Sequence, residues 1–152
     1  MELKTDPGAP ELTCSPEEMA DLVVATAAAA QATCRLVVRS FDWRGLSHLQ
    51  HLHPTISLAW LTHGHASGRA VAEASQGRGQ WSPLFTDLTQ DAVREAQALG
   101  LRVNPWTVNA PSDMARMIAW GVDGLCTDRP DLARAVMAAH GLALPQPRPK
   151  PV

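Results

Sequence analysis

The sequence predicts an α/β fold on a parallel sheet, and within that class it favours a barrel of the TIM type. Short apolar runs alternate with amphipathic helical segments along most of the 152 residues, which is the pattern of repeated βαβ units. The rival architecture, an open doubly wound sheet, usually carries a glycine-rich phosphate turn after its first strand, and no such motif occurs here. Polar and aromatic residues follow several expected strands, where a barrel places its active site.

The first half of the chain predicts three strands and two helices. A short strand, ELK, opens it. The next helix begins at Ser15, with Pro16 at its first position and Glu18 placed to complete a capping box. A strand in RLVVRSF, a helix in RGLSHLQHLH and a strand in TISLAWLT follow. In that helix the spacing predicts inward-facing leucines at Leu46, Leu49 and Leu52.

The second half continues the alternation after a weaker, glycine-containing segment from His63 to Gln80. QWSPLF predicts a short irregular strand, and TQDAVREAQALG predicts a helix that Gly100 closes. LRVNPWTVN is expected as a strand with a bulge, because Pro105 has no N–H for the ladder. The remaining expected elements are a helix in PSDMARMIAWG, a strand in GLCTD and a helix in PDLARAVMAAHG.

These elements assign residues 1–142 to one barrel-like region and 143–152 to a proline-rich, disordered tail. The chain is 45% hydrophobic with a formal net charge of −2, so no electrostatic footprint for nucleic acid is present. No membrane span or signal peptide is predicted, and the expected location is the cytoplasm. The three cysteines are widely spaced and are expected to be reduced.

Five motifs, in their order and spacing, resemble the later part of the glycerophosphodiester phosphodiesterase family: MELKT, VVRSFDWRGLSHLQHLHP, QWSPLFTDLT, GLRVNPWTVN and MIAWGVDGLCTDRPD. The resemblance implies a TIM barrel that hydrolyses glycerophosphodiesters to an alcohol and glycerol 3-phosphate, in lipid and phospholipid metabolism. It also implies a divalent cation, Mg²⁺ or Ca²⁺, and two histidines as general acid and base.

The resemblance implies roles for four residues. Glu2 matches a carboxylate that helps to hold the metal ion, for which a hard oxygen ligand is suitable. Lys4, two residues further on the same face of a strand, matches the lysine that approaches the phosphate. Phe41 and Trp106 match aromatic residues that line the substrate pocket and pack against the glycerol.

Other family motifs are missing. The His-Arg pair of the first strand, the Glu-x-Asp carboxylates of the second strand and the second histidine do not occur, so no catalytic residue is assigned. By this alignment the chain begins at the third strand and holds about six of the eight βα units of a barrel. It is therefore expected to be a fragment or a truncated gene product. Both edges of such a partial barrel would expose unpaired backbone and favour homo-oligomers.

Two alternatives stay open at this point. The chain is either part of an active phosphodiesterase or an inactive remnant that serves as a binding or oligomerising module. A third hypothesis is an unrelated metal binder, because two imidazoles on one helical face can hold zinc or nickel. Its candidate ligands are His48, His51, His53, His63 and His65.

Overall fold

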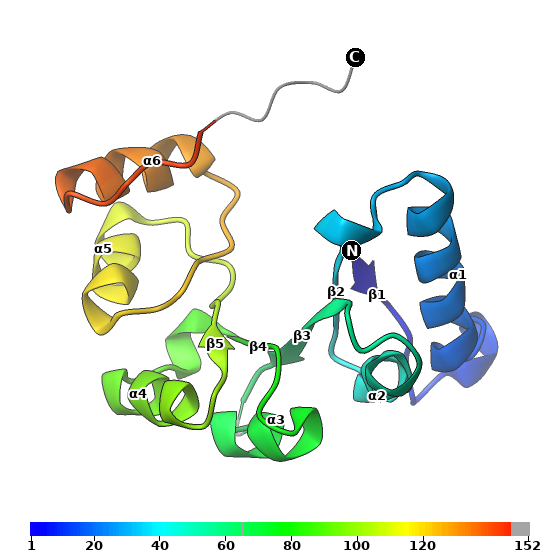
Figure 1. The fold of residues 1–152 in the computed structure, drawn as a ribbon. Helices are drawn as coiled ribbons and strands as arrows, with labels where there is room; N and C mark the ends of the chain where they lie inside the picture. The colour runs from blue at the N-terminus through cyan, green and yellow to red at the C-terminus, as the bar shows by residue number, and fades with distance from the viewer. Residues whose placement is uncertain (65, 147–152) are drawn as a thin grey trace.

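The computed structural model describes residues 1–64 and 66–146, and they form alternating strands and helices (Figure 1). The five strands are β1 (Glu2–Leu3), β2 (Val37–Ser40), β3 (Ser57–Thr62), β4 (Gln80–Pro83) and β5 (Arg102–Val103). The helices are α1 (Pro16–Ala29), α2 (Trp43–Leu52), α3 (Gly68–Ser75), α4 (Gln90–Ala98), α5 (Pro111–Trp120) and α6 (Pro130–Ala139). Short 3₁₀ turns occupy Pro10–Leu12, Thr33–Arg35 and Phe85–Asp87.

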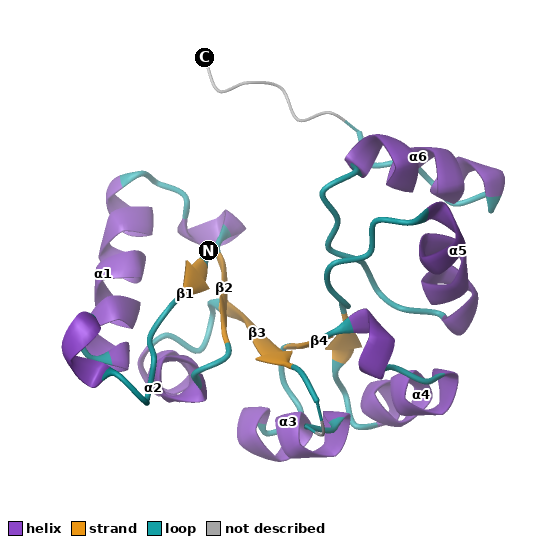
Figure 2. Ribbon diagram, turned by 180° about the vertical axis from the view of Figure 1, so that it is seen from behind, coloured by secondary structure: helices purple, strands orange, loops and turns teal. Residues whose placement is uncertain are grey.

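The strands form one parallel sheet in the order β1-β2-β3-β4-β5, with a helix between each strand and the next along the chain. The sheet curves into an arc, and the helices lie on its outer side (Figures 1 and 2). It does not close, because no pairing joins β1 to β5. The α/β class and the incomplete barrel predicted from the sequence are therefore confirmed.

The sixth expected strand, in GLCTD, is absent as a regular strand from the described residues. Its segment nevertheless runs beside the chain after β5, because Cys126 N–H donates to Pro105 O at 2.9 Å and Val108 N–H donates to Cys126 O at 2.8 Å. The predicted strand in LRVNPWTVN is likewise shortened to β5 and one isolated bridge between Leu84 and Trp106. Asn104 and Trp106 both donate to β4, so Pro105 leaves a donor missing on the side that faces the GLCTD segment.

The core lies between the sheet and the outer helices. Its largest fully buried side chains include Trp60 from β3, Leu46 and Leu49 from α2, Val71 from α3 and Val93 from α4. The expectation that Leu52 would also face inward was wrong, because its side chain is 59% exposed at the last turn of α2. The spacing of the leucines predicts which face of α2 is apolar, but it does not show how far the neighbouring elements extend along that face.

The described residues end within the proline-rich segment. Arg134 of α6 donates to Pro145 O at 2.8 Å, so the start of the proline-rich segment contacts the last helix. Residues 147–152, most of the predicted tail, lie outside the described residues. Within the part of the chain that is described, no helix is long and apolar enough to cross a membrane.

A buried carboxylate fixes the turn from β2 into α2. Asp42 caps the helix by accepting from Arg44 N–H at 3.2 Å. It also accepts from Arg44 Nε and Nη2, at 3.0 and 2.7 Å, and from Thr5 Oγ1 at 2.8 Å. The hydrogen bonds from the Arg44 side chain lower the pKa of Asp42, against the opposing effect of burial, and Thr5 adds to the lowering. This network ties the segment after β1 to the start of α2.

We expect Asp42→Asn to lower the free energy of unfolding by about 1–2 kcal/mol at pH 7, because it removes the charge from the cap. The Asp42 pKa is lower in the folded state than the unfolded value of about 3.9, so its contribution is full above that value and is lost as the pH falls through the lowered pKa. Urea unfolding from pH 7 to pH 2 should show the two proteins converging in acid.

Asp131→Asn is the matched control, because Asp131 also pairs with an arginine two residues away, Arg129, but is 61% exposed. It should destabilise the protein less than Asp42→Asn does. A difference between Asp42→Asn and wild type that stays constant across the pH range would contradict the assignment.

Gly45 lies where α2 packs on the start of α1. A Cβ atom at this position would stand 2.9 Å from Pro16 O and 3.0 Å from Leu3 Cδ1. Since the first neighbour is backbone, relief requires the two helices to separate. The close packing of α2 on the start of α1 therefore depends on the absence of a side chain at Gly45.

Gly45→Ala should lower the free energy of unfolding by about 1–3 kcal/mol through overpacking, measured by urea unfolding at pH 7. The control Ser47→Ala, at an exposed position of the same helix, reports helix propensity alone and should change stability by less than about 0.5 kcal/mol. Equal stability of Gly45→Ala and wild type would show that the helices separate freely.

Candidate active site

The four residues singled out from the sequence gather at one end of the sheet. Glu2 lies in β1 and Lys4 directly follows that strand, while Phe41 directly follows β2. Trp106 follows β5 and bridges to Leu84 beyond the end of β4. Because the strands are parallel, their carboxyl ends meet at the same edge, which is where barrels of this type carry their active sites.

Glu2 lies between two cations. Its Oε2 atom is 3.2 Å from Arg39 Nε and its Oε1 atom is 3.8 Å from Lys4 Nζ. The pairing register places Arg39 directly beside Glu2 on β2. The Glu2 and Arg39 side chains are each 27% exposed, whereas Lys4 is 82% exposed. The cluster as a whole is positive, and Lys4 is its accessible charge.

These residues do not fit a divalent cation on their own. Mg²⁺ and Ca²⁺ take six or more oxygen ligands, usually from several carboxylates. In residues 1–64 and 66–146, no group of three or more His, Cys, Asp or Glu side chains is arranged to hold a metal ion. Glu2 is the carboxylate expected to contribute, and it is already neutralised by Arg39 and Lys4.

The histidine hypothesis finds no support in the described region. His48 Nε2 lies 2.8 Å from Asp21 Oδ1, so it links α2 to α1. His51 Nδ1 lies 3.0 Å from Ser47 O, a backbone atom of its own helix. His65 lies outside the described residues. The imidazoles of α2 therefore have structural partners, and no metal-binding group includes them.

Phe41 and Trp106 contact each other, as the pocket assignment requires. Their ring centroids are 5.4 Å apart with an interplanar angle of 83°. A third ring, that of His63, lies 5.5 Å from Phe41 at 61°. Sequence reasoning considered His63 only as a metal ligand and missed this contact. The available signal was its position, directly after the apolar strand TISLAWLT.

Hydrogen bonds from the neighbouring strands hold Trp106. Its indole Nε1 donates to Ser82 O at 2.9 Å, and its backbone N–H donates to Pro83 O at 3.0 Å. Its carbonyl accepts from Phe85 N–H at 2.9 Å. Asn104 N–H also donates, to Trp81 O at 2.9 Å, so the pairing with β4 continues on both sides of Pro105 and fixes the indole at the rim of the sheet.

Asn109 and Asp128 meet at the ends of their two segments. Asn109 Nδ2 donates to Asp128 Oδ2 at 2.9 Å, and Asn109 Oδ1 accepts from Asp128 N–H at 2.9 Å and from Thr127 Oγ1 at 3.0 Å. This set of bonds replaces the regular pairing that the last segment lacks. Because the polar atoms of these residues hydrogen-bond to one another, we assign the residues a structural role.

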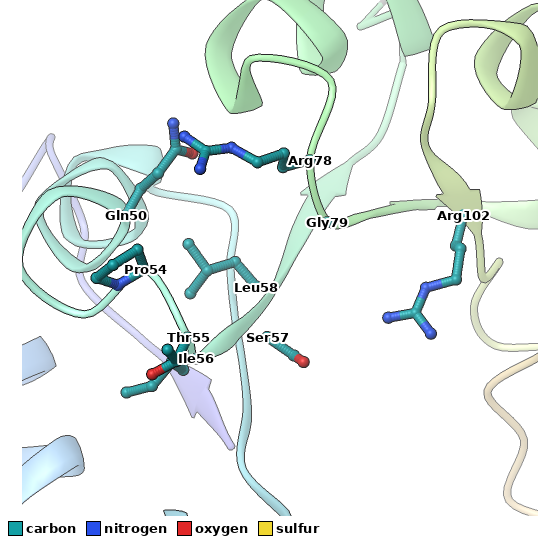
Figure 3. Close-up of a pocket in the computed structure, with 9 residues that line it drawn as sticks. All are labelled: Gln50, Pro54, Thr55, Ile56, Ser57, Leu58, Arg78, Gly79 and Arg102. Atoms are coloured by element: carbon teal, nitrogen blue, oxygen red, sulfur yellow. The ribbon is translucent and has the colours of Figure 1, made fainter. Parts of the chain in front are cut away.

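Two cavities lie away from the strand ends that carry the candidate residues. One of about 200 Å³ lies at the amino ends of β3, β4 and β5, and Arg78 and Arg102 are among its lining residues (Figure 3). The second, about 360 Å³, is on the inner face of the sheet, where Arg39, Gln80 and Asn104 contribute to its lining. Asn104 Nδ2 donates to Gln80 there, and Arg39 Nη1 contacts Cys126 Sγ at 3.7 Å. The lining of this cavity is mixed, because Val37, Ala59 and Leu125 also contribute to it.

The family model described as "Glycerophosphoryl diester phosphodiesterase family" matches residues 2–132. A glycerophosphodiester phosphodiesterase of Bacillus subtilis is 29% identical over 110 residues, which are 70% of this chain and 38% of that protein. A crystal structure of a candidate glycerophosphoryl diester phosphodiesterase from Silicibacter pomeroyi matches with a TM-score of 0.81 and 34% identity, covering 93% of this chain and 50% of the other.

A phosphodiesterase from Oleispira antarctica, in complex with the product sn-glycerol-3-phosphate, has a TM-score of 0.74 at 20% identity, over 90% of this chain and 53% of its own. At that identity the likeness concerns the fold. The chain spans half or less of the length of the Bacillus and Silicibacter proteins. Since the family model covers most of its residues, the chain belongs to the glycerophosphoryl diester phosphodiesterase family.

Proposed function

We propose that this chain forms the larger part of a barrel that hydrolyses glycerophosphodiesters, with water, to an alcohol and glycerol 3-phosphate. The observation that carries the proposal is the contact of the Phe41 and Trp106 rings at the carboxyl ends of the strands in a member of this family. Lys4 and Phe41 directly follow Leu3 and Ser40, which are paired in the β1–β2 register. The Oleispira relative, which was solved with sn-glycerol-3-phosphate, supports a substrate of this chemical class. Such a reaction belongs to phospholipid metabolism and, in our proposal, takes place in the cytoplasm.

Lys4 would bind the phosphate. Its ammonium is the exposed charge of the cluster, and Glu2 and Arg39 beside it are more buried and already paired with each other. A lysine approaches a phosphate as a compact point charge with three donors. Phe41 and Trp106 would pack against the glycerol and exclude water from that side.

Proton transfer is not assigned to a residue of this chain. His48 and His51 lie on α2 with partners of their own, Asp21 Oδ1 and Ser47 O, and His63 after β3 contacts the Phe41 ring. Glu2 would contribute one oxygen to a Mg²⁺ or Ca²⁺ ion, but the described residues do not complete such a site, so we assign this chain no metal-dependent step. General acid and base would come from barrel strands that the described sheet does not contain.

A second candidate role is a binding or oligomerising module without turnover. One specific observation favours it: no described strand pairs with the outer side of β1. The outer side of β5 is covered, because Val103 N–H donates to Asp123 Oδ2 at 2.8 Å and Val103 O accepts from Asp123 N–H at 2.9 Å. An open sheet edge presents unpaired N–H and C=O groups to other chains, so copies of this chain would associate through the β1 edge.

We expect the chain to bind glycerol 3-phosphate, and Lys4→Ala to weaken this binding about tenfold, because a charge-assisted hydrogen bond to phosphate is lost. Isothermal titration calorimetry at low salt measures both. Arg94→Ala removes an equally positive, exposed side chain from α4 and should leave the affinity unchanged. If Lys4→Ala and Arg94→Ala lowered the affinity for glycerol 3-phosphate equally, the loss would come from the change in net charge, and the assignment of Lys4 to the phosphate would be contradicted.

The 152-residue chain alone should release no glycerol 3-phosphate from glycerophosphocholine with Mg²⁺ or Ca²⁺, because it lacks assigned proton-transfer groups. Enzymatic detection of glycerol 3-phosphate measures this, with Glu2→Ala in parallel. Turnover that disappears in Glu2→Ala would show that this chain carries a complete catalytic site and would overturn that part of the proposal.

Size-exclusion chromatography with light scattering tests whether the chain oligomerises: a monomer at all concentrations argues against association through a sheet edge.

A further inference from the structure

The cavity of about 200 Å³ at the amino ends of β3, β4 and β5 lies at the opposite edge of the sheet from Lys4. We call it the amino-end cavity. Its lining includes two positively charged side chains: Arg78, two residues before β4, and Arg102, the first residue of β5. None of the described residues that line it is an aspartate or a glutamate. The cavity therefore carries positive charge that its own walls do not neutralise.

The two guanidinium groups also lack carboxylate partners from elsewhere. In residues 1–64 and 66–146, Arg102 makes no ion pair, and Arg78 donates only to the neutral amide of Gln76, at 2.9 Å from Oε1. Asp123, which borders β5, already accepts from Val103 N–H at 2.8 Å. Carboxylates pair instead with other arginines, namely Arg39, Arg44, Arg69, Arg94, Arg116 and Arg129.

Gly79 fixes the backbone of both arginines. Its φ angle is +102°, a conformation that favours glycine, and a Cβ atom there would stand 2.8 Å from Leu58 O. The turn before β4 can approach β3 this closely only because the side chain is absent. Arg78 directly precedes Gly79, and Arg102 N–H donates to Gly79 O at 3.2 Å. One turn thus holds the two cations at the same cavity.

The surroundings of Gly79 offer hydrogen-bond donors without acceptors. Within the part of the chain that the structure describes, Gly79 N–H has no acceptor. Trp60 Nε1 lies 3.5 Å from the point where a Gly79 Cβ would stand, and this buried donor has no partner there either. Buried donors without acceptors are uncommon in proteins. Together with the two guanidinium groups, they favour an anionic ligand over a cationic one.

We propose that the amino-end cavity binds a small dicarboxylate whose two carboxylates are joined by a short apolar chain. Arg78 extends on the side of Gln50, whereas Arg102 extends on the side of Ser57 (Figure 3). Each guanidinium group is a fork that matches one carboxylate, so two separated arginines favour a ligand with a carboxylate at each end. Leu58 lies between the two sides and would contact the apolar chain (Figure 3).

The size of the cavity limits the ligand. Sites for drug-sized molecules usually occupy about 300–1,000 Å³, and the amino-end cavity is smaller, at about 200 Å³. A dicarboxylate of a few carbon atoms is therefore the expected class. Because the cavity is at the opposite edge of the sheet from Lys4, this inference does not depend on the proposed function.

The test titrates the full chain with malonate, glutarate and adipate, which carry the same charge but differ in length. Backbone amide resonances, followed by NMR at pH 7.5 and low salt, report both the site and the affinity. Adipate should shift the Gly79 and Arg102 resonances and bind about tenfold tighter than malonate, because malonate reaches one guanidinium group only. Arg78→Gln and Arg102→Gln should each weaken adipate binding about tenfold and remove the dependence on length.

Arg94→Gln removes an exposed arginine from α4, is the matched control and should bind adipate as wild type does. Circular dichroism checks that each variant is folded. Equal affinities for malonate and adipate, or wild-type affinity in Arg78→Gln and Arg102→Gln, overturn the inference. So do the absence of binding and shifts confined to Lys4 and Phe41, which would place the ligand at the carboxyl ends of the strands.

Discussion

The parallel direction of all five strands is the constraint on which the rest of this structure depends. Because each strand returns in the same direction after a helix, side chains that follow separate strands come together at one edge of the sheet. Lys4, Phe41 and His63 follow β1, β2 and β3 in turn, although they are distant along the sequence. Antiparallel pairing would have sent them to opposite ends.

The loops after the strands contain two kinds of residue: some are bound to other residues of the chain and serve the structure, and others are exposed and available for binding. Asp42 stands next to Phe41, yet its carboxylate is buried and bound to Thr5 and Arg44. This leaves the Phe41 ring as the exposed group of that turn. Beyond β5, at the ends of their two segments, Asn109 and Asp128 bind each other and hold the last irregular segment. The polar residues at a strand end thus do not all belong to a site, and their partners decide which do.

Polar side chains share the inner face of the sheet with apolar ones, which distinguishes it from the interior of a closed barrel packed with branched apolar side chains. Arg39, Gln80 and Asn104 line that face, and Arg39 pairs with Glu2 across the β1–β2 register. A buried charge needs a partner, and the ion pair supplies it. The same pair places a cation beside the carboxylate that the family resemblance proposes as a metal ligand.

Much of this could be predicted from the sequence alone: the family, the parallel α/β class, the strand–helix order, and the nearness of Phe41 to Trp106. The class and the element order follow from local signals, such as the Ser15 cap and the apolar runs, whereas the nearness of Phe41 to Trp106 is what the family resemblance implies. Only the tertiary structure decided that GLCTD forms no regular strand, that Leu52 is exposed, that Arg39 pairs with Glu2 and that His63 contacts Phe41. Each of these outcomes depends on residues brought together by strand register and helix packing, and periodicity within a single segment carries no information about its neighbours.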